Sequence, residues 1–190
     1  MSGSSTDTIR VFIAARPNEA AQAELLRIQR ELKKSLARFG LRIKWTDPDT
    51  FHITLLFLGD LPAADIHPVF QCLEKTCART RALRTSLNGA GLFKKSGALW
   101  AGIHAGPDLL ELQKRLCASL NMEPGRFHAH FTLGRIKKGR PDSEFFQTLE
   151  QASIQPVPFN IHALELVKSE LFPDGARHTV LRLFSLFPHL

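Results

Sequence analysis

Apolar and polar residues follow two different periods along this chain. Alternating stretches rich in valine, isoleucine, leucine and phenylalanine predict strands, and stretches with an apolar residue every three or four positions predict amphipathic helices. We predict strands over residues 9–15, 41–45, 51–58, 84–92, 98–105, 127–136, 159–168 and 178–187, and helices over residues 18–39, 65–77, 107–120 and 142–152. Each half of the chain then repeats the order strand, helix, strand, helix, strand. This repetition indicates two similar lobes related by an approximate two-fold axis.

The ends of several elements carry residues suited to starting or stopping them. Asn18 and Asp65 are N-cap candidates, because their side-chain oxygens can accept hydrogen bonds from free backbone N–H groups at the start of a helix. Gly40 can adopt the left-handed conformation that ends a helix. We expect the turn residue Gly59 to end the strand over residues 51–58.

The short pattern His-x-Thr-Leu occurs once in each half, each time inside a predicted strand. The first copy begins at His52 and the second at His130. Successive side chains of a strand point to opposite faces, so His52 shares a face with Thr54, and His130 shares a face with Thr132. The apolar residues between and after them point toward the core. Each copy therefore presents one imidazole and one hydroxyl, at an equivalent place in each half.

Two such pairs facing one cleft suit the cleavage of a phosphodiester without a metal. Opening a cyclic phosphodiester needs a base that takes a proton from water and an acid that protonates the leaving oxygen. Imidazole, with an ordinary pKa of about 6.5, can fill either role. The hydroxyls of Thr54 and Thr132 can donate hydrogen bonds to the non-bridging oxygens, where charge develops in the transition state. The residue types leave open whether His52 or His130 is the acid.

Three further residues near the second copy are candidates for substrate binding. His128 would share the face of His130 in an extended strand. The pair also fits a metal site, but the sequence offers no obvious third ligand and no His-Glu-x-x-His motif. Arg135 could bind a phosphate through two hydrogen bonds or lie on the solvated surface. Arg126 leaves the same two alternatives open.

Length and charge limit the domain organisation and the kind of partner. The chain has 190 residues, 44% of them hydrophobic, which is enough for a core without disulfides or metals. We expect a single domain over residues 8–190, with two lobes over about residues 8–92 and 98–190, and a flexible N-terminus over residues 1–7. A formal net charge of +7 is compatible with solubility alone and slightly favours a polyanionic partner such as RNA or DNA.

Cysteine usage and hydropathy indicate the compartment. Three cysteines, without a Cys-x-x-Cys pair, argue against a disulfide framework and against a structural zinc site. The start of the chain lacks the apolar stretch of a signal peptide, and no window has the ~18 apolar residues of a membrane helix. We therefore expect a cytoplasmic protein that is not attached to a membrane.

Five segments of the chain carry a resemblance to known proteins. They are the strand at residues 9–14, the motif segments at residues 45–60 and 127–135, the strand at residues 99–103 and the hairpin at residues 169–181. Together they resemble the two-histidine phosphoesterase superfamily, and most closely the RNA 2′,3′-cyclic phosphodiesterases of the LigT/ThpR family, long called 2′-5′ RNA ligases. The family often has Arg-Pro-Phe-x-Pro-His before the second motif. Here both prolines are missing and the basic residue, Arg126, is displaced by one position.

The resemblance implies an α+β, bilobal LigT-like fold, with two antiparallel sheets and flanking helices around a central cleft. It implies hydrolysis of RNA 2′,3′-cyclic phosphate ends to 2′-phosphomonoesters and, in some members, reversible joining of RNA ends through a 2′-5′ bond. On matching positions it makes His52 the proton donor to the leaving 3′-oxygen and His130 the proton acceptor that activates water. Thr54 and Thr132 would bind the phosphoryl oxygens. It implies no metal or other cofactor, RNA with a 2′,3′-cyclic phosphate or a 2′-5′ linkage as the partner, and we expect a monomer.

Two alternatives stay open. The same chemistry could act on a small cyclic phosphate, such as a cyclic nucleotide or an ADP-ribose cyclic phosphate. A non-catalytic module could instead use the cleft and its positive charge only to bind RNA.

Overall fold

The structure, a computed structural model, describes residues 7–152, 154–173 and 175–187. Its helices are α1 (Glu19–Leu36), α2 (Ile66–Cys77), α3 (Pro107–Ser119) and α4 (Ser143–Glu150). Its strands are β1 (Thr8–Ala15), β2 (Arg42–Trp45), β3 (Ile53–Pro62), β4 (Leu83–Phe93), β5 (Ala98–Ile103), β6 (His130–Lys138), β7 (Pro158–Ile161), β8 (Ala163–Phe172) and β9 (Gly175–Ser185). Of the N-terminal segment expected to be flexible, residues 1–6 lie outside the described residues.

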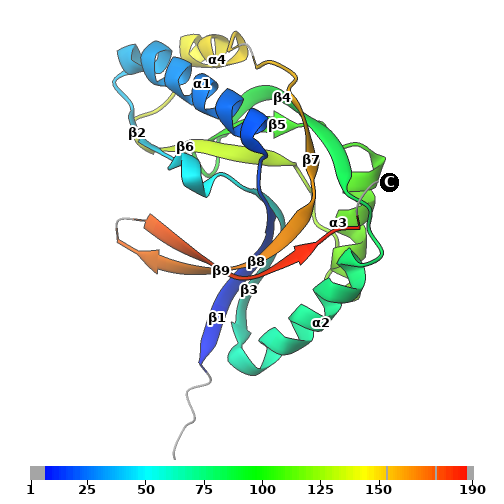
Figure 1. The fold of residues 1–190 in the computed structure, drawn as a ribbon. Helices are drawn as coiled ribbons and strands as arrows, with labels where there is room; N and C mark the ends of the chain where they lie inside the picture. Colours follow the sequence, from blue (N-terminus) through cyan, green and yellow to red (C-terminus); the bar gives the residue numbers. More distant parts are fainter. Residues whose placement is uncertain (1–6, 153, 174, 188–190) are drawn as a thin grey trace, which may run out of the picture.

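The strands form one curled antiparallel sheet flanked by helices, which confirms the α+β class (Figure 1). Their order is β7-β4-β5-β6-β3-β1-β8-β9, and β2 also pairs with β6. The two antiparallel sheets that the resemblance implied are joined here into one. The junction is narrow, because β3 and β6 pair through a single register position, Ile53 opposite Phe131.

Strands from the two sequence halves are mixed in this sheet. β1 and β3, from the first half, lie beside β8 and β9 from the second, and β4 lies between β5 and β7. Each end of the sheet therefore combines segments that are distant in the chain. The assignment of residues 8–92 and 98–190 to two lobes rests on the repeated order of elements and stays a prediction.

Helices cover one face of the sheet and leave the other face to the cleft. In Figure 1, α1 and α4 lie together over the half of the sheet that contains β4 and β7, and α2 and α3 lie together against the half that contains β3, β8 and β9. The side chains of Ile53, Leu55, Phe131 and Leu133 are at most 2% exposed and belong to the main core. The predicted core direction of both motif strands is confirmed. No helix in the described part of the chain is long and apolar enough to cross a membrane.

The predicted N-cap and C-terminal glycine of the first helix are confirmed, and the predicted N-cap of α2 is wrong. The side chain of Asn18 accepts a hydrogen bond of 2.9 Å from the backbone N–H of Ala21, and Gly40 ends the first helical segment with φ +61°. Asp65 makes no capping hydrogen bond. A 3-10 turn over Ala63–Asp65 precedes α2, so Asp65 already has a helical backbone rather than the extended one that a capping side chain needs.

Both motif strands begin later than predicted. β3 starts at Ile53 and continues past Gly59, where we expected it to end. Between β1 and β3, Val11 pairs with Gly59 and Phe12 with Phe57, so β3 contains an extra residue at this place, the first of two in its pairing with β1. Such a bulge accepts the positive φ of Gly59 (+79°) without ending the pairing.

The second motif strand and the strand predicted over residues 159–168 also differ from the prediction. β6 begins at His130, since residues 122–129 form a loop, and His128 therefore lies outside the strand. The stretch over residues 159–168 forms two strands, β7 and β8, separated at His162. Hydrophobic alternation alone does not reveal such breaks, because loop residues can keep the same alternation.

Candidate active site

The pairing of β3 with β6 brings the two His-x-Thr motifs together. Ile53 and Phe131, which face each other across the two strands, directly follow His52 and His130. Since both apolar side chains point into the core, their neighbours point to the opposite face. Both histidines and both threonines of the motifs line one cleft of about 740 Å³.

A buried glutamine of α1 supports the strand that carries the second motif. The side-chain nitrogen of Gln29 donates to the backbone carbonyls of Thr46 (2.7 Å) and Leu133 (2.9 Å). Thr46 follows β2, and its own N–H donates to the carbonyl of Leu133. From Leu133 toward His130, the same edge of β6 pairs with β3 instead of β2. Gln29 thus fixes the backbone directly beside Thr132.

Both catalytic candidates are oriented in the same way. The Nδ1 atom of His52 lies 2.8 Å from the carbonyl oxygen of Thr50, and the Nδ1 atom of His130 lies 2.7 Å from that of His128. A carbonyl only accepts hydrogen bonds, so Nδ1 carries the proton in each ring. The Nε2 atom of each ring is left to accept a proton from, or return one to, a bound molecule.

Each imidazole contacts a phenylalanine and a second histidine. The ring of His52 lies 5.0 Å from that of Phe12 on β1 and 5.3 Å from that of His178 on β9, measured between centroids. The ring of His130 lies 4.9 Å from that of Phe93 on β4 and 5.9 Å from that of His128. These contacts limit the rotation of both imidazole rings.

Burial lowers the pKa of both imidazoles. For His52 the pKa falls to about 4, mainly because its charged form loses hydration, with smaller contributions from the positive charges of His178, Arg16 and His130. The pKa of His130 is also lowered, again mainly by burial, and the lowering is smaller. The hydrogen bond from each Nδ1 to a carbonyl opposes these effects. Without a bound anion both rings are therefore neutral near pH 7.

The cleft around the four motif residues is mainly basic. Arg135 lines it, and its guanidinium donates a hydrogen bond of 2.7 Å to the carbonyl of Ser96. Lys44, Lys137 and Arg177 also line it, against a single carboxylate, that of Asp47. Such a lining attracts an anion such as a phosphodiester.

His128 and Arg126 line a second cleft that adjoins the first. This cleft of about 800 Å³ shares the residues Thr54 and His130 with the first one, and we call it the side arm. The ring of His128 packs on Trp100 at 4.7 Å and Arg126 is exposed. Of the seven predicted site residues, five therefore line the first cleft, and the other two, His128 and Arg126, line only the side arm.

Sequence reasoning missed three residues at the site, His178, Phe12 and Phe93. His178 lies in the closing hairpin segment that supported the resemblance, but nothing in its local pattern pointed to His52. It reaches His52 because β9 pairs with β8, β8 with β1, and β1 with β3. Phe12 could have been found from the alternation of β1, which turns it away from the core residues Val11 and Ile13.

The described residues contain no group of three or more histidine, cysteine, aspartate or glutamate side chains that could hold a metal ion. The predicted independence from metals and other cofactors stays a prediction about the reaction.

Comparison with known proteins agrees with this geometry. The family model "LigT like Phosphoesterase" matches residues 16–100, which include the first His-x-Thr motif. An RNA 2′,3′-cyclic phosphodiesterase of Methanothermobacter thermautotrophicus is 25% identical over 186 residues, which cover 94% of this chain and 99% of that protein. The chain is therefore similar to the LigT-like phosphoesterases over nearly its whole length.

Solved structures of LigT-like phosphoesterases share the fold over nearly the whole chain. TT0787 of Thermus thermophilus superposes with a TM-score of 0.78 at 26% identity, covering 96% of this chain and all of that one. LigT of E. coli in its apo form superposes with a TM-score of 0.74 at 20% identity, covering 95% of this chain and 99% of that one. A complex of E. coli LigT with 3′-AMP also matches, with a TM-score of 0.71.

Proposed function

We propose that this protein hydrolyses the 2′,3′-cyclic phosphodiester at the end of an RNA to a 2′-phosphomonoester. The observation that carries the proposal is the convergence of both His-x-Thr motifs on one basic cleft, with an Nε2 atom of each ring left free for proton transfer. Relatives named RNA 2′,3′-cyclic phosphodiesterase cover nearly the whole chain and support the same reaction.

In the proposed reaction the two histidines act at opposite sides of the phosphorus atom. The Nε2 atom of His130 takes a proton from a water molecule whose oxygen attacks phosphorus. The bond between phosphorus and the 3′-oxygen breaks, and the Nε2–H group of His52 protonates that oxygen. The 2′-phosphate is the product, and the next cycle begins when the proton on His130 is lost and His52 is protonated again.

The hydroxyls of Thr54 and Thr132 would donate hydrogen bonds to the two non-bridging oxygens. Both oxygens gain negative charge as water adds, and fixed donors aimed at such charge lower the barrier. Arg135 and the other basic residues of the cleft would hold the phosphodiester anion in place before the reaction.

The assignment of His52 as the acid rests on the match of its motif to the family pattern. Both imidazoles have a lowered pKa, that of His52 about 4, so either ring releases a proton readily once it is protonated. The negative charge of a bound phosphodiester favours the imidazolium form, so substrate binding supplies part of the cost of protonating His52. The assignment of roles remains a proposal that the leaving-group experiment in the Discussion tests.

The experiment that tests the function uses a short RNA with a 2′,3′-cyclic phosphate end, incubated with the purified protein in excess chelator. We expect conversion to an end that a phosphatase can remove, with the phosphate on the 2′-oxygen as shown by phosphorus NMR. An intact cyclic end after long incubation would refute the proposal. A 3′-phosphate product would contradict the assigned leaving group.

Parallel assays separate the alternative substrates. A cyclic mononucleotide or an ADP-ribose cyclic phosphate that is turned over faster than the RNA would identify a small-molecule phosphodiesterase. Binding of RNA without any turnover would identify a binding module. Joining of RNA ends through a 2′-5′ bond, cytoplasmic location and a monomeric state stay predictions.

A further inference from the structure

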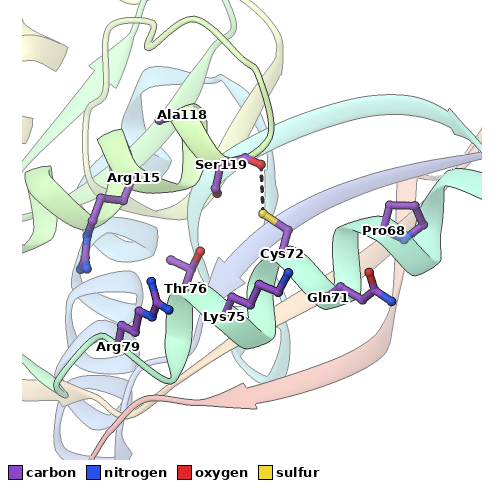
Figure 2. A pocket seen from close by; sticks show the side chains of 9 residues that line it. All are labelled: Pro68, Gln71, Cys72, Lys75, Thr76, Arg79, Arg115, Ala118 and Ser119. Atoms are coloured by element: carbon purple, nitrogen blue, oxygen red, sulfur yellow. Dashed lines mark hydrogen bonds between the residues drawn. The ribbon is translucent and has the colours of Figure 1, made fainter.

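A cavity separate from the catalytic cleft lies between α2 and α3. It has a volume of about 620 Å³ and shares no lining residue with the catalytic cleft or the side arm. Figure 2 shows α2 and α3 crossing at this pocket, where the Sγ atom of Cys72 lies 3.1 Å from the carbonyl oxygen of Ser119. We call it the helix pocket.

The helix pocket is lined by three cations and no carboxylate. Lys75 and Arg79 come from α2 and the residues that follow it, and Arg115 comes from α3. Figure 2 shows Arg79 and Arg115 reaching the same end of the pocket from the two helices. Among the described residues no ion pair involves these three side chains. Glu74, the neighbour of Lys75, is instead paired with Arg182 of β9.

Arg115 also retains an unused buried donor. One terminal nitrogen of its guanidinium donates to the hydroxyl of Thr80 at 3.0 Å, whereas its Nε atom is buried and has no hydrogen-bond partner. Buried donors are normally satisfied, so this unpaired nitrogen, on a side chain that lines the pocket, favours an acceptor bound beside the guanidinium once it turns toward the opening. An anion with several oxygens meets this need and neutralises the charge.

α3 connects the helix pocket with the side arm of the catalytic cleft. Gln113 of α3 and Met122, just after the helix, line the side arm, and Arg115 and Ser119 line the helix pocket. A strand of RNA whose end lies at His130 and which leaves through the side arm passes the C-terminal end of α3. The helix pocket, which Ser119 of the same helix end lines, offers three cations there.

We infer that the helix pocket is a second RNA-binding site, which holds a backbone phosphate of the substrate at a distance from the scissile end. The inference rests on the proposed function and narrows its substrate from any cyclic phosphate to an RNA of several nucleotides. Contacts to phosphate fix the position of a strand without reading its sequence, and they weaken as salt rises.

The test compares a double variant of the pocket with a matched control. K75A/R79A removes one lysine and one arginine, four positions apart on the exposed side of α2 and its end. R30A/K34A removes the same pair of charges at the same spacing on α1, at the other end of the molecule (Figure 1). Both pairs are exposed, so both variants should fold.

Steady-state kinetics are measured with a 12-nucleotide RNA that ends in a 2′,3′-cyclic phosphate and with a cyclic mononucleotide. For K75A/R79A we expect KM for the RNA to rise roughly tenfold at low salt, because each lost phosphate contact costs about threefold, with kcat unchanged. The salt dependence of log KM should become shallower by about 0.7 for each lost contact. The mononucleotide is too short to reach the pocket, so its kinetics should not change.

Fluorescence anisotropy with a labelled RNA of the same length, ending in a plain hydroxyl, tests the pocket independently of turnover. If the wild-type protein cleaves nothing, the proposed function fails and the anisotropy still decides whether the pocket binds RNA. Equal RNA affinity of K75A/R79A and wild type would overturn the inference. An equal loss of affinity in R30A/K34A would overturn it as well, because the effect would then come from net charge alone.

Discussion

The two His-x-Thr sites of this protein share the contacts that orient each histidine ring and differ in the second histidine beside it. In each, a carbonyl two residues before the histidine accepts the hydrogen bond of Nδ1, and a phenylalanine of another strand contacts the ring. The second histidine differs in origin. His178 comes to His52 from β9, the last strand of the sheet, whereas His128 belongs to the loop that leads directly into His130.

This difference gives the histidines of the two motif copies different environments. The rings of Phe12 and His178 cover His52, and burial lowers its pKa to about 4. The lowering at His130 is smaller, so a proton is held more weakly at His52 than at His130. The two copies of the motif thus hold a proton with different strength, because different elements pack around each copy.

The largest expected effect is the loss of either imidazole. H52A and H130A should each lower kcat/KM for a cyclic phosphate by roughly 10²-fold or more, since each removes one general acid or base. A nucleoside p-nitrophenyl phosphodiester, whose leaving group needs no proton, separates the roles. H130A should remain strongly impaired with this substrate, while H52A should recover most of its activity. Recovery in H130A instead would reverse our assignment.

The next largest effect concerns the two hydroxyls. T54V and T132V keep a β-branched side chain of similar size and should each lower kcat by roughly 10²-fold, because each removes one donor to the charge that develops on phosphate. Steady-state kinetics with the cyclic RNA check this, and circular dichroism checks that the strands remain. If only one variant loses activity, a single hydroxyl faces the reacting phosphate.

A smaller effect, on the pH dependence of kcat/KM, distinguishes His178, which contacts His52, from His128, which contacts His130. The pair His52 and His130 must hold one proton for the reaction. Because the pKa of each ring is lowered, the fall of kcat/KM with rising pH should have its midpoint below about pH 6.5. H178A exposes the ring of His52 to water and removes a nearby positive charge. Both changes raise the pKa of His52, so the acidic limb of the kcat/KM profile, where both rings become protonated, should move to higher pH. An unchanged pH profile of H178A, measured beside H128A, would show that His178 has no influence on the reaction.

The smallest effect is on the stability of the fold. The pKa of His52 is about 4 in the folded protein and about 6.5 in the unfolded chain, so the unfolded chain binds the proton first as pH falls. His52 therefore contributes stability above pH 6.5 that is lost progressively down to about pH 4. Urea unfolding at pH 7 and pH 5 should show a smaller loss of stability in H52Q than in wild type. An equal loss of stability in H52Q and wild type would show that titratable groups other than His52 cause it.

Local sequence determined the elements and much of the site. Alternation placed the first strand and the motif threonines correctly, and the helical period placed the buried stripe of α1, with Asn18 and Gly40 at its ends. Element ends depend on pairing partners, so the bulge at Gly59 and the late start of β6 at His130 could not be read from the pattern.

The repeated motif alone determined that two histidines and two threonines lie on the cleft faces of two strands, because successive side chains of a strand point to opposite faces. The single pairing of Ile53 with Phe131 decided that these faces meet. Tertiary structure alone brought His178 and Phe12 to His52 and set its pKa, since burial and charge depend on neighbours that are distant in the chain.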